Sequence, residues 1–157
     1  MEQQSVIHNT FVIERSYPVA PEKVFSALAD PDKKRRWYAH GQGHDVEEFV
    51  MDFRVGGEER TRYRFKEGTP FPGVLLLTDG SIQDIVPDRR MVIASTMTLG
   101  ERRISSTLVT FELLKSEQGT DLILTHQGAF YEGADGPKMR EDGWRGLMDS
   151  LAAELAR

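Results

Sequence analysis

The sequence predicts an α+β fold, an antiparallel sheet with helices packed against one of its faces. Beyond Gly43 the side chains alternate with a period of two, as in strands, to about residue 127. From Pro137 to the terminus the apolar residues recur instead at helical spacing. The long helix has one apolar stripe and the sheet one apolar face, so each must cover the other.

The first strand is expected at residues 10–17, where Phe11, Ile13 and Tyr17 fall on one side. Arg15 shares their parity, which would place its guanidinium on the inner face of the sheet. A charge there is costly unless it is paired or lies near a cavity mouth, and strand twist or a bulge would turn it outward instead. The sequence leaves these two alternatives open.

Two short helices are expected next, each opened by a proline. Pro21 begins the run PEKVFSALA, whose apolar residues have helical spacing. Asp30 directly precedes Pro31, which combines an N-cap with a first-turn proline. The second helix is expected to run through Trp37.

Six more strands follow. Phe49, Met51 and Phe53 share one face of the first, and Tyr63 and Phe65 share one face of the second. The other four are expected at about 74–86, 90–98, 103–114 and 120–127.

Three arginines occupy alternating positions after a Gly-Gly pair: Arg60, Arg62 and Arg64. Period two places them on the face opposite Tyr63 and Phe65. Asp52, Arg54 and Glu58 share that outer face, where cross-strand ion pairs between acidic side chains and the arginines are expected. We expect a solvated, ion-paired face; a nucleic-acid stripe, an anion site and a partner-protein site are the alternatives.

The long C-terminal helix carries a glycine, Gly143, at a position of its apolar stripe. Glycine in a helix costs roughly 1 kcal/mol against alanine, so a compensating role is expected. One alternative is a close approach of the helix backbone to the sheet. The other is missing volume that leaves room for a ligand beside Trp144.

The amino-acid composition excludes several classes of partner and chemistry. The net charge of −5 gives no general attraction for nucleic acid or anionic membranes. The chain has no cysteine, which excludes disulfides, thiol nucleophiles and cysteine metal sites. The N-terminal MEQQSVIHNT lacks a secretory pattern, and the longest apolar run, VLLL, is too short to span a membrane. We expect one cytoplasmic domain over residues 1–157, ordered from about 10 to 156, with no nucleic-acid or membrane partner.

Histidines are the first candidates for chemistry. His40 and His44 lie four apart with Glu47 and Glu48 behind them, a spacing that could hold a metal on a helix. Glycines interrupt the segment, so a solvated loop is expected and no metal site is assigned.

His126 shares the parity of Leu122 and Leu124, so it is expected to point toward the helix, where a neutral imidazole needs a hydrogen-bond partner. A satisfied interior histidine, a polar contact for a ligand and a general base are the alternatives. No nucleophile or carboxylate is tied to it by spacing, so no catalytic residue is assigned.

The run YPVAPEKVFSALADPDKKRRWY resembles the START-like (SRPBCC) superfamily, which has the helix-grip fold of the birch-pollen allergen. DFRVGG, SSTLVTFEL, TDLILTHQG and DGWRGLMDSLAAEL resemble its AHSA-type subfamily, named for activators of the ATPase of the ninety-kilodalton heat-shock chaperone. The matches run from about residue 10 to the terminus. The resemblance implies a curved seven-stranded antiparallel sheet around a long C-terminal helix, two short helices after the first strand, and usually a cavity between sheet and helix.

Superfamily relatives bind lipids, hormones or polyketides, and a few catalyse cyclisation or dehydration of a bound ligand. The eukaryotic co-chaperones have a separate N-terminal chaperone-binding domain, for which this chain is expected to have no room. The resemblance therefore implies non-covalent binding of a small hydrophobic or aromatic ligand, without a cofactor. A co-chaperone-like or other partner-protein regulator is the first alternative, a cyclase- or hydrolase-like enzyme the second.

Candidate cavity residues are aromatic, sulfur-containing or polar side chains of inward parity, together with the glycine of the last helix and the end of the second short helix. They are Trp37, Tyr38, Phe49, Met51, Tyr63, Phe65, Met97, His126, Gly143, Trp144 and Met148. The ligand, any protein partner and the oligomeric state are left open.

Overall fold

The computed structural model describes residues 5–41 and 43–157, in which seven strands form one antiparallel sheet in the order β1-β7-β6-β5-β4-β3-β2. The strands are β1 (Ile7–Tyr17), β2 (His44–Met51), β3 (Glu58–Phe65), β4 (Leu75–Val86), β5 (Arg90–Leu99), β6 (Arg102–Ser116) and β7 (Gly119–Phe130). The helices are α1 (Pro21–Ala29), α2 (Pro31–Lys34), the π-helix η1 (Arg35–Ala39) and α3 (Pro137–Leu155). The predicted α+β class and helix-grip arrangement are confirmed.

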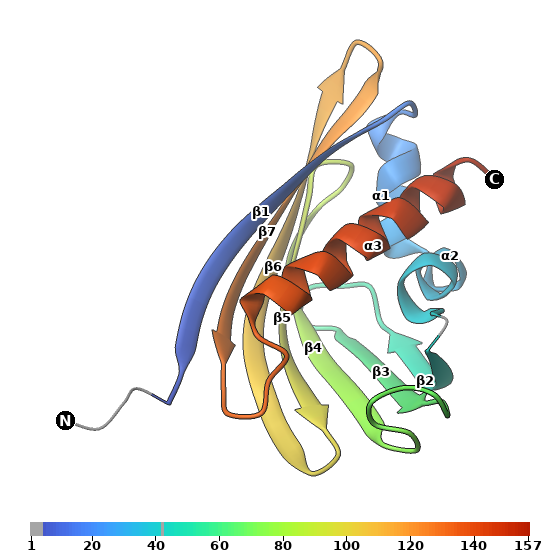
Figure 1. Cartoon of the computed structure of the whole chain (residues 1–157). Coiled ribbons are helices and arrows are strands. Elements are labelled where there is room, and N and C mark those ends of the chain that lie inside the picture. The colour runs from blue at the N-terminus through green and yellow to red at the C-terminus, as the bar shows by residue number, and fades with distance from the viewer. Residues whose placement is uncertain (1–4, 42) are drawn as a thin grey trace.

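The sheet is curved, and α3 lies diagonally across its concave face (Figure 1). Three one-residue register shifts interrupt the strand pairing, at Glu47 in β2, Gln83 in β4 and Ile104 in β6. A β-bulge of this kind bends its strand and increases the local twist. The bulges therefore help to give the sheet the cup shape that leaves space beneath the helix.

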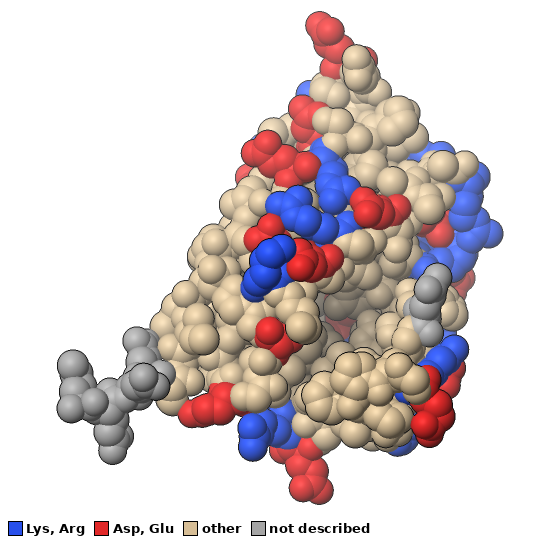
Figure 2. Space-filling view, in the orientation of Figure 1, with Lys and Arg blue, Asp and Glu red and all other residues tan. Residues whose placement is uncertain are grey.

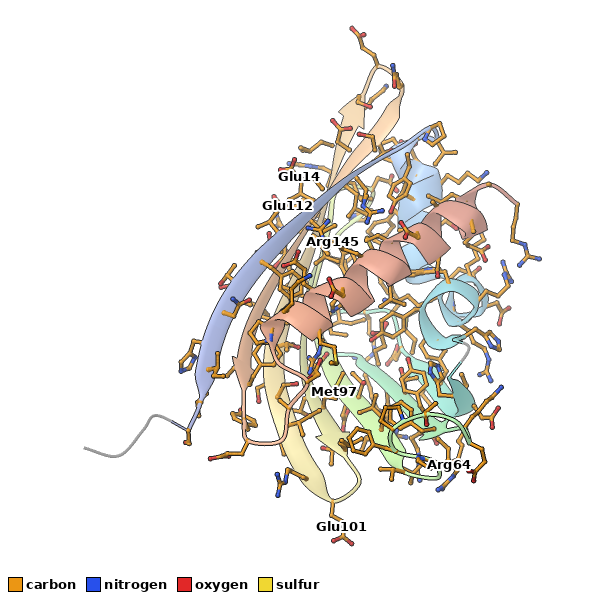
Figure 3. All side chains as sticks on the ribbon, in the orientation of Figure 1. Glu14, Arg64, Met97, Glu101, Glu112 and Arg145 are labelled. Carbon is orange, nitrogen blue, oxygen red and sulfur yellow. The ribbon has the colours of Figure 1, made fainter. Side chains whose placement is uncertain are left out.

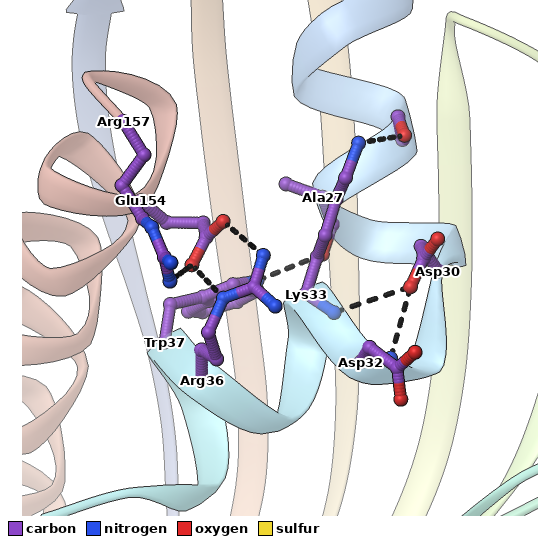
Figure 4. A network of polar contacts seen from close by, with 9 residues as sticks. Ala27, Asp30, Asp32, Lys33, Arg36, Trp37, Glu154 and Arg157 are labelled. Atoms are coloured by element: carbon purple, nitrogen blue, oxygen red, sulfur yellow. Dashed lines mark hydrogen bonds and ion pairs between the residues drawn. The ribbon is translucent and has the colours of Figure 1, made fainter.

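Proline opens each of the three α-helices, as the sequence predicts for the first two and for the long one. Asp30 is the N-cap of α2, accepting hydrogen bonds from the backbone N–H groups of Asp32 and Lys33 at 2.9 and 3.2 Å (Figure 4). The helical segment does not end at Trp37 but continues as η1 to Ala39. That boundary was wrong.

The short helices are tied both to each other and to α3. Trp37 Nε1 donates to the carbonyl oxygen of Ala27 at 2.8 Å, and the Arg36 guanidinium makes two hydrogen bonds to the Glu154 carboxylate (Figure 4). Glu154 lies near the end of α3, so this contact fixes η1 beside the C-terminal half of the long helix. The hydrogen bonds from the Arg36 guanidinium hold the pKa of the Glu154 carboxyl below its usual range.

The packed core lies under the C-terminal half of α3. Leu151 and Leu155 are buried there as the helical pattern predicts. At the N-terminal end of the helix the same apolar stripe is not buried: Met139 is 64% exposed and Gly143 is also exposed. The N-terminal half of α3 therefore does not pack tightly on the sheet.

Arg15 faces inward by register, opposite Leu122, and its charge is paired at the edge of α3. Its Nη1 lies 2.6 Å from Asp149 Oδ1, and its Nη2 donates to the Arg145 carbonyl oxygen at 3.4 Å. Of the two alternatives for this residue, the structure has the inward one. Pairing with a helix carboxylate removes the cost of an unpaired inner charge.

The arginine row lies on the face opposite α3, as predicted, because Thr61 and Tyr63 between the arginines are buried on the inner side. Arg62 and Arg64 are exposed and Arg60 is half-buried. The nucleic-acid alternative gains no support, since acidic side chains accompany the row.

The partners of the row were predicted only in part. Glu58 binds Arg60 as expected, but Asp52 and Arg54 pair with each other instead of with the row. The main partners are two consecutive glutamates of β2: Glu48 with Arg60 at 2.7 Å and Glu47 with Arg64 at 2.9 Å. Consecutive strand residues normally face opposite sides, and the bulge at Glu47 lets both reach the outer face.

Replacing all three arginines with serine is expected to lower the melting temperature by no more than a few degrees, because exposed ion pairs contribute little to stability. The control on the inner face of the same strand is Tyr63→Ala, which should cost about 3 kcal/mol or more. Thermal melts followed by circular dichroism measure both. Unfolding of the triple variant at room temperature would show that the arginines anchor the strand.

None of the helices described in residues 5–41 and 43–157 has the length and apolar composition needed to cross a membrane.

Candidate functional site

A cavity of about 670 Å³ lies between the concave face of the sheet and the N-terminal half of α3. Figure 2 shows its opening as a hollow in the surface below the helix. Phe71, in the loop between β3 and β4, and Met139, in the first turn of α3, both line the cavity and are 49% and 64% exposed. These two apolar side chains therefore mark its mouth.

Most of the wall is apolar. Its aliphatic and aromatic side chains come from η1, strands β3 to β6, the β3–β4 loop, the β7–α3 loop and α3. They are Tyr38, Tyr63, Phe65, Pro70, Phe71, Leu76, Ile93, Met97, Leu99, Ile104, Val109, Phe111, Ala134, Met139, Trp144 and Leu147. Figure 3 labels Met97 on the concave side of the sheet, below the start of α3.

Polar side chains cross the floor of the cavity along one row of paired strand positions. The row runs from β3 to β6 as Glu59, Gly80, Ser95 and Thr107. A side chain at Gly80 would meet Ser95, because a Cβ there would lie 2.7 Å from Ser95 Oγ. The serine hydroxyl thus leans across the glycine toward the strand that carries Glu59.

A buried ion pair closes the β3 end of this row. Lys34 of α2 and Glu59 are 1% and 5% exposed, and both line the cavity. Lys34 Nζ lies 2.9 Å from Glu59 Oε1, but the contact lacks hydrogen-bond geometry, and Glu59 Oε1 has no hydrogen-bond partner among the described residues. The ammonium also lies 4.9 Å from the ring centre of Tyr38, which adds a cation–π contact.

Neither member of this pair was predicted from the sequence. Lys34 stands in the charged run DKKRR and has no feature that separates it from solvated neighbours. Glu59 did carry a signal, because it has the same parity as the inward Tyr63. A carboxylate at an inner position needs a partner, which the second short helix supplies.

A second ion pair lies at the start of α3. Arg140 Nε and Nη2 donate to the two carboxylate oxygens of Asp135 at 2.7 and 2.8 Å, and Nη2 also donates to Ser105 Oγ at 3.1 Å. The guanidinium lies over the ring of Phe130 at 5.0 Å. This pair is bidentate and further bonded, so its hydrogen-bonding groups are largely occupied.

His126 points inward, as predicted, and is 1% exposed. Its ring stacks on Phe11 with the centres 4.4 Å apart. Nδ1 has no hydrogen-bond partner in the described part of the chain, so the fully satisfied interior histidine is not what the structure shows. Burial, assisted by the positive charge of Arg140, lowers the pKa of His126 to about 4, and the ring is neutral near pH 7.

Two phenols of the wall remain protonated. Burial raises the pKa of Tyr38 well above its usual value, and the neighbouring Tyr63 and Glu59 raise it further. Burial likewise raises the pKa of Tyr63. Both side chains therefore present neutral hydroxyl groups.

Seven of the sequence candidates line the cavity: Tyr38, Tyr63, Phe65, Met97, His126, Gly143 and Trp144. A Cβ built at Gly143 meets no atom within 4 Å, so the glycine leaves open space rather than a close approach to the sheet.

Four candidates lie outside the lining. Trp37 is 1% exposed and packs in the core instead of lining the cavity. Met148 is fully buried on the packed half of α3, with Sδ 3.8 Å from the hydroxyl of Tyr17. Phe49 and Met51 face inward by register, but they belong to the edge strand β2, beyond the wall of the cavity. Parity gives the face of a strand but not how far the cavity reaches along it.

The predicted loop holds for His40 but not for His44. His44 begins β2 and lines the cavity, with Nε2 2.9 Å from the carbonyl oxygen of Ala39 and its ring against Tyr63 at 4.2 Å. Glu47 and Glu48 face the arginine row on the other side. Over the described ranges no three histidine or acidic side chains are grouped closely enough to hold a metal ion.

The sequence model of one family, described as "Activator of Hsp90 ATPase homolog 1-like protein", matches residues 18–156. The chain belongs to this family. The AHSA1-like assignment agrees with the helix-grip architecture and with the SRPBCC superfamily resemblance of the sequence.

Two solved structures are similar to this AHSA1-like chain in both sequence and fold. The Mll3558 protein from Rhizobium loti is 48% identical with a TM-score of 0.85, over 96% of this chain and 99% of the other. A putative uncharacterized protein from Rhizobium leguminosarum is 34% identical with a TM-score of 0.90, over 98% and 97%.

An AHSA1-like protein from Aeromonas hydrophila shows the same fold at 20% identity, with a TM-score of 0.67 over 94% of this chain and 92% of that one. No curated protein matches the chain.

Proposed function

We propose that this AHSA1-like protein binds a small hydrophobic or aromatic ligand non-covalently in the cavity beneath α3. The observation that carries the proposal is the open volume of about 670 Å³ with a mainly apolar wall. Ligand sites in proteins have roughly 300–1,000 Å³ and combine an apolar lining with a few polar groups that orient the ligand. Burial of apolar ligand surface would supply the binding free energy.

The mouth supports the same function. Phe71 and Met139 are large, exposed apolar side chains at the opening of an apolar cavity, and exposed apolar surface around a groove is typical of a ligand-binding site. Both also line the cavity, so an incoming ligand would contact them before it reaches the interior.

Two glycines of α3 provide a matched test. Gly143 lines the cavity and Gly146 does not, yet a Cβ at either position meets no atom within 4 Å. Leucine at either position gains a similar helix propensity, up to about 1 kcal/mol. We expect Gly143→Leu to lose most of its binding of the neutral dye N-phenyl-1-naphthylamine, whereas Gly146→Leu should bind it like the parent protein.

Dye fluorescence titrations and thermal melts of the three proteins measure these effects. All three should be folded, and both leucine variants should melt at or above the temperature of the parent. A parent protein that does not bind the dye, or a Gly143→Leu variant that binds it as tightly as Gly146→Leu does, would contradict ligand binding in this cavity.

A further inference from the structure

The positive and negative charges of the ionised side chains that line the cavity are equal in number. Lys34 is paired with Glu59, and Arg140 with Asp135. A ligand that brought a net charge into this wall would carry it into a low-dielectric space without an opposite charge left to receive it. A neutral ligand avoids this cost.

The two ion pairs differ in what they leave unoccupied. Arg140 and Asp135 are joined by two hydrogen bonds, with a third to Ser105. Lys34 and Glu59 share one 2.9 Å contact without hydrogen-bond geometry, although an ammonium has three donors and a carboxylate about four acceptor positions. Of the two ion pairs, Lys34 and Glu59 therefore leave more hydrogen-bonding capacity unused; His126 Nδ1 is a further cavity-lining atom without a partner among the described residues, but it is a single neutral atom and not a charged pair.

A hydroxyl group fits this pair better than an ether or a carboxylate does. It can accept a hydrogen bond from Lys34 and donate one to Glu59 with a single oxygen atom. An ether oxygen could only accept, and a carboxylate would be repelled by Glu59. The Ser95 hydroxyl, which leans toward β3 across Gly80, extends the polar side of the cavity next to the carboxylate.

We infer that the Lys34–Glu59 pair is the polar subsite of the cavity and that its ligand is a neutral alcohol or phenol with an apolar body. The hydroxyl group binds between the ammonium and the carboxylate, and the apolar body extends toward Met97 and Trp144. This assignment rests on the ligand-binding function proposed above and names the class of ligand and its orientation.

Three naphthalenes that differ only in their polar group test the subsite: 2-naphthol, 2-methoxynaphthalene and 2-naphthoate. We expect the parent protein to bind 2-naphthol about tenfold or more tightly than either of the others, because hydrogen bonds to charged groups are the strong ones. Isothermal titration calorimetry at pH 7 measures the three dissociation constants.

Two variants separate a role in ligand binding from a structural one. In Lys34→Met/Glu59→Leu the buried charges are removed together, and we expect the preference for 2-naphthol over its ether to shrink to about twofold or less while N-phenyl-1-naphthylamine still binds. In Glu59→Gln the ammonium loses its counter-charge, and the preference should move from 2-naphthol toward 2-naphthoate.

The polar subsite is overturned if 2-naphthol binds the parent protein no more tightly than its ether, or if the double variant keeps the preference. In either case the cavity would still be a ligand site if the parent protein binds the dye and Gly143→Leu abolishes that binding. Absence of dye binding in the parent protein would instead remove the proposed function and the subsite with it.

Discussion

Lys34→Met is expected to lower the free energy of unfolding by about 3–5 kcal/mol, because it leaves the Glu59 carboxylate buried without a counter-charge. The two side chains are 1% and 5% exposed, so little water is in contact with the carboxylate to replace the lost ammonium. Methionine has nearly the length of the lysine stem, which keeps the loss of packing small. Urea unfolding at pH 7 measures the effect.

The control is the double variant Lys34→Met/Glu59→Leu, which removes both charges. It should recover most of the lost stability, since replacing a buried ion pair with apolar residues of similar size is often neutral or stabilising. A single variant as stable as the parent protein would mean that the pair is not buried as the structure has it. A double variant no better than the single one would assign the loss to packing of Lys34 instead.

Acid should destabilise the protein through His126. In the folded state the ring has a pKa of about 4 and is neutral near pH 7. In the unfolded chain its pKa is the ordinary 6.5, so as the pH falls the unfolded state takes up the proton at a higher pH than the folded state does. The stabilising contribution is therefore complete above pH 6.5 and is lost as the pH falls toward 4. The shift corresponds to a contribution on the order of 3 kcal/mol.

His126→Phe isolates this contribution, because a phenyl ring can stack on Phe11 but cannot be protonated. Urea unfolding from pH 7.5 to 4 measures the unfolding free energy of both proteins. As the pH falls from 6.5 to 4, the parent protein should lose more stability than the variant. Carboxylates with lowered pKa values, such as Glu47 and Glu154, act equally in both proteins and cancel in the difference. Parallel curves would show that the histidine is not buried in its neutral form.

The sequence alone determined which faces of the secondary-structure elements turn inward. Alternation placed Tyr63 and His126 toward the helix and the arginine row away from it, because a period of two assigns every second side chain to one face. Asp30 and the three helix-opening prolines were equally local signals, since a cap or a first-turn proline acts within a few residues. The fold class followed from these patterns, and the family from the resemblance of runs such as YPVAPEKVFSALADPDKKRRWY.

Only the tertiary structure decided where the inner face is packed and where it is hollow. The sequence pattern of α3 is continuous, yet Leu151 is buried and Met139 is exposed, because the curved sheet approaches only one half of the helix. The bulge at Glu47 turned two consecutive glutamates to one face, which strict alternation cannot predict. Lys34 and Glu59 meet from a helix and a strand 25 positions apart, and no local period records a contact between separate elements. Periodicity encodes the direction of a side chain, whereas a cavity depends on the distance between two surfaces, and that distance is fixed only when the sheet bends around the helix.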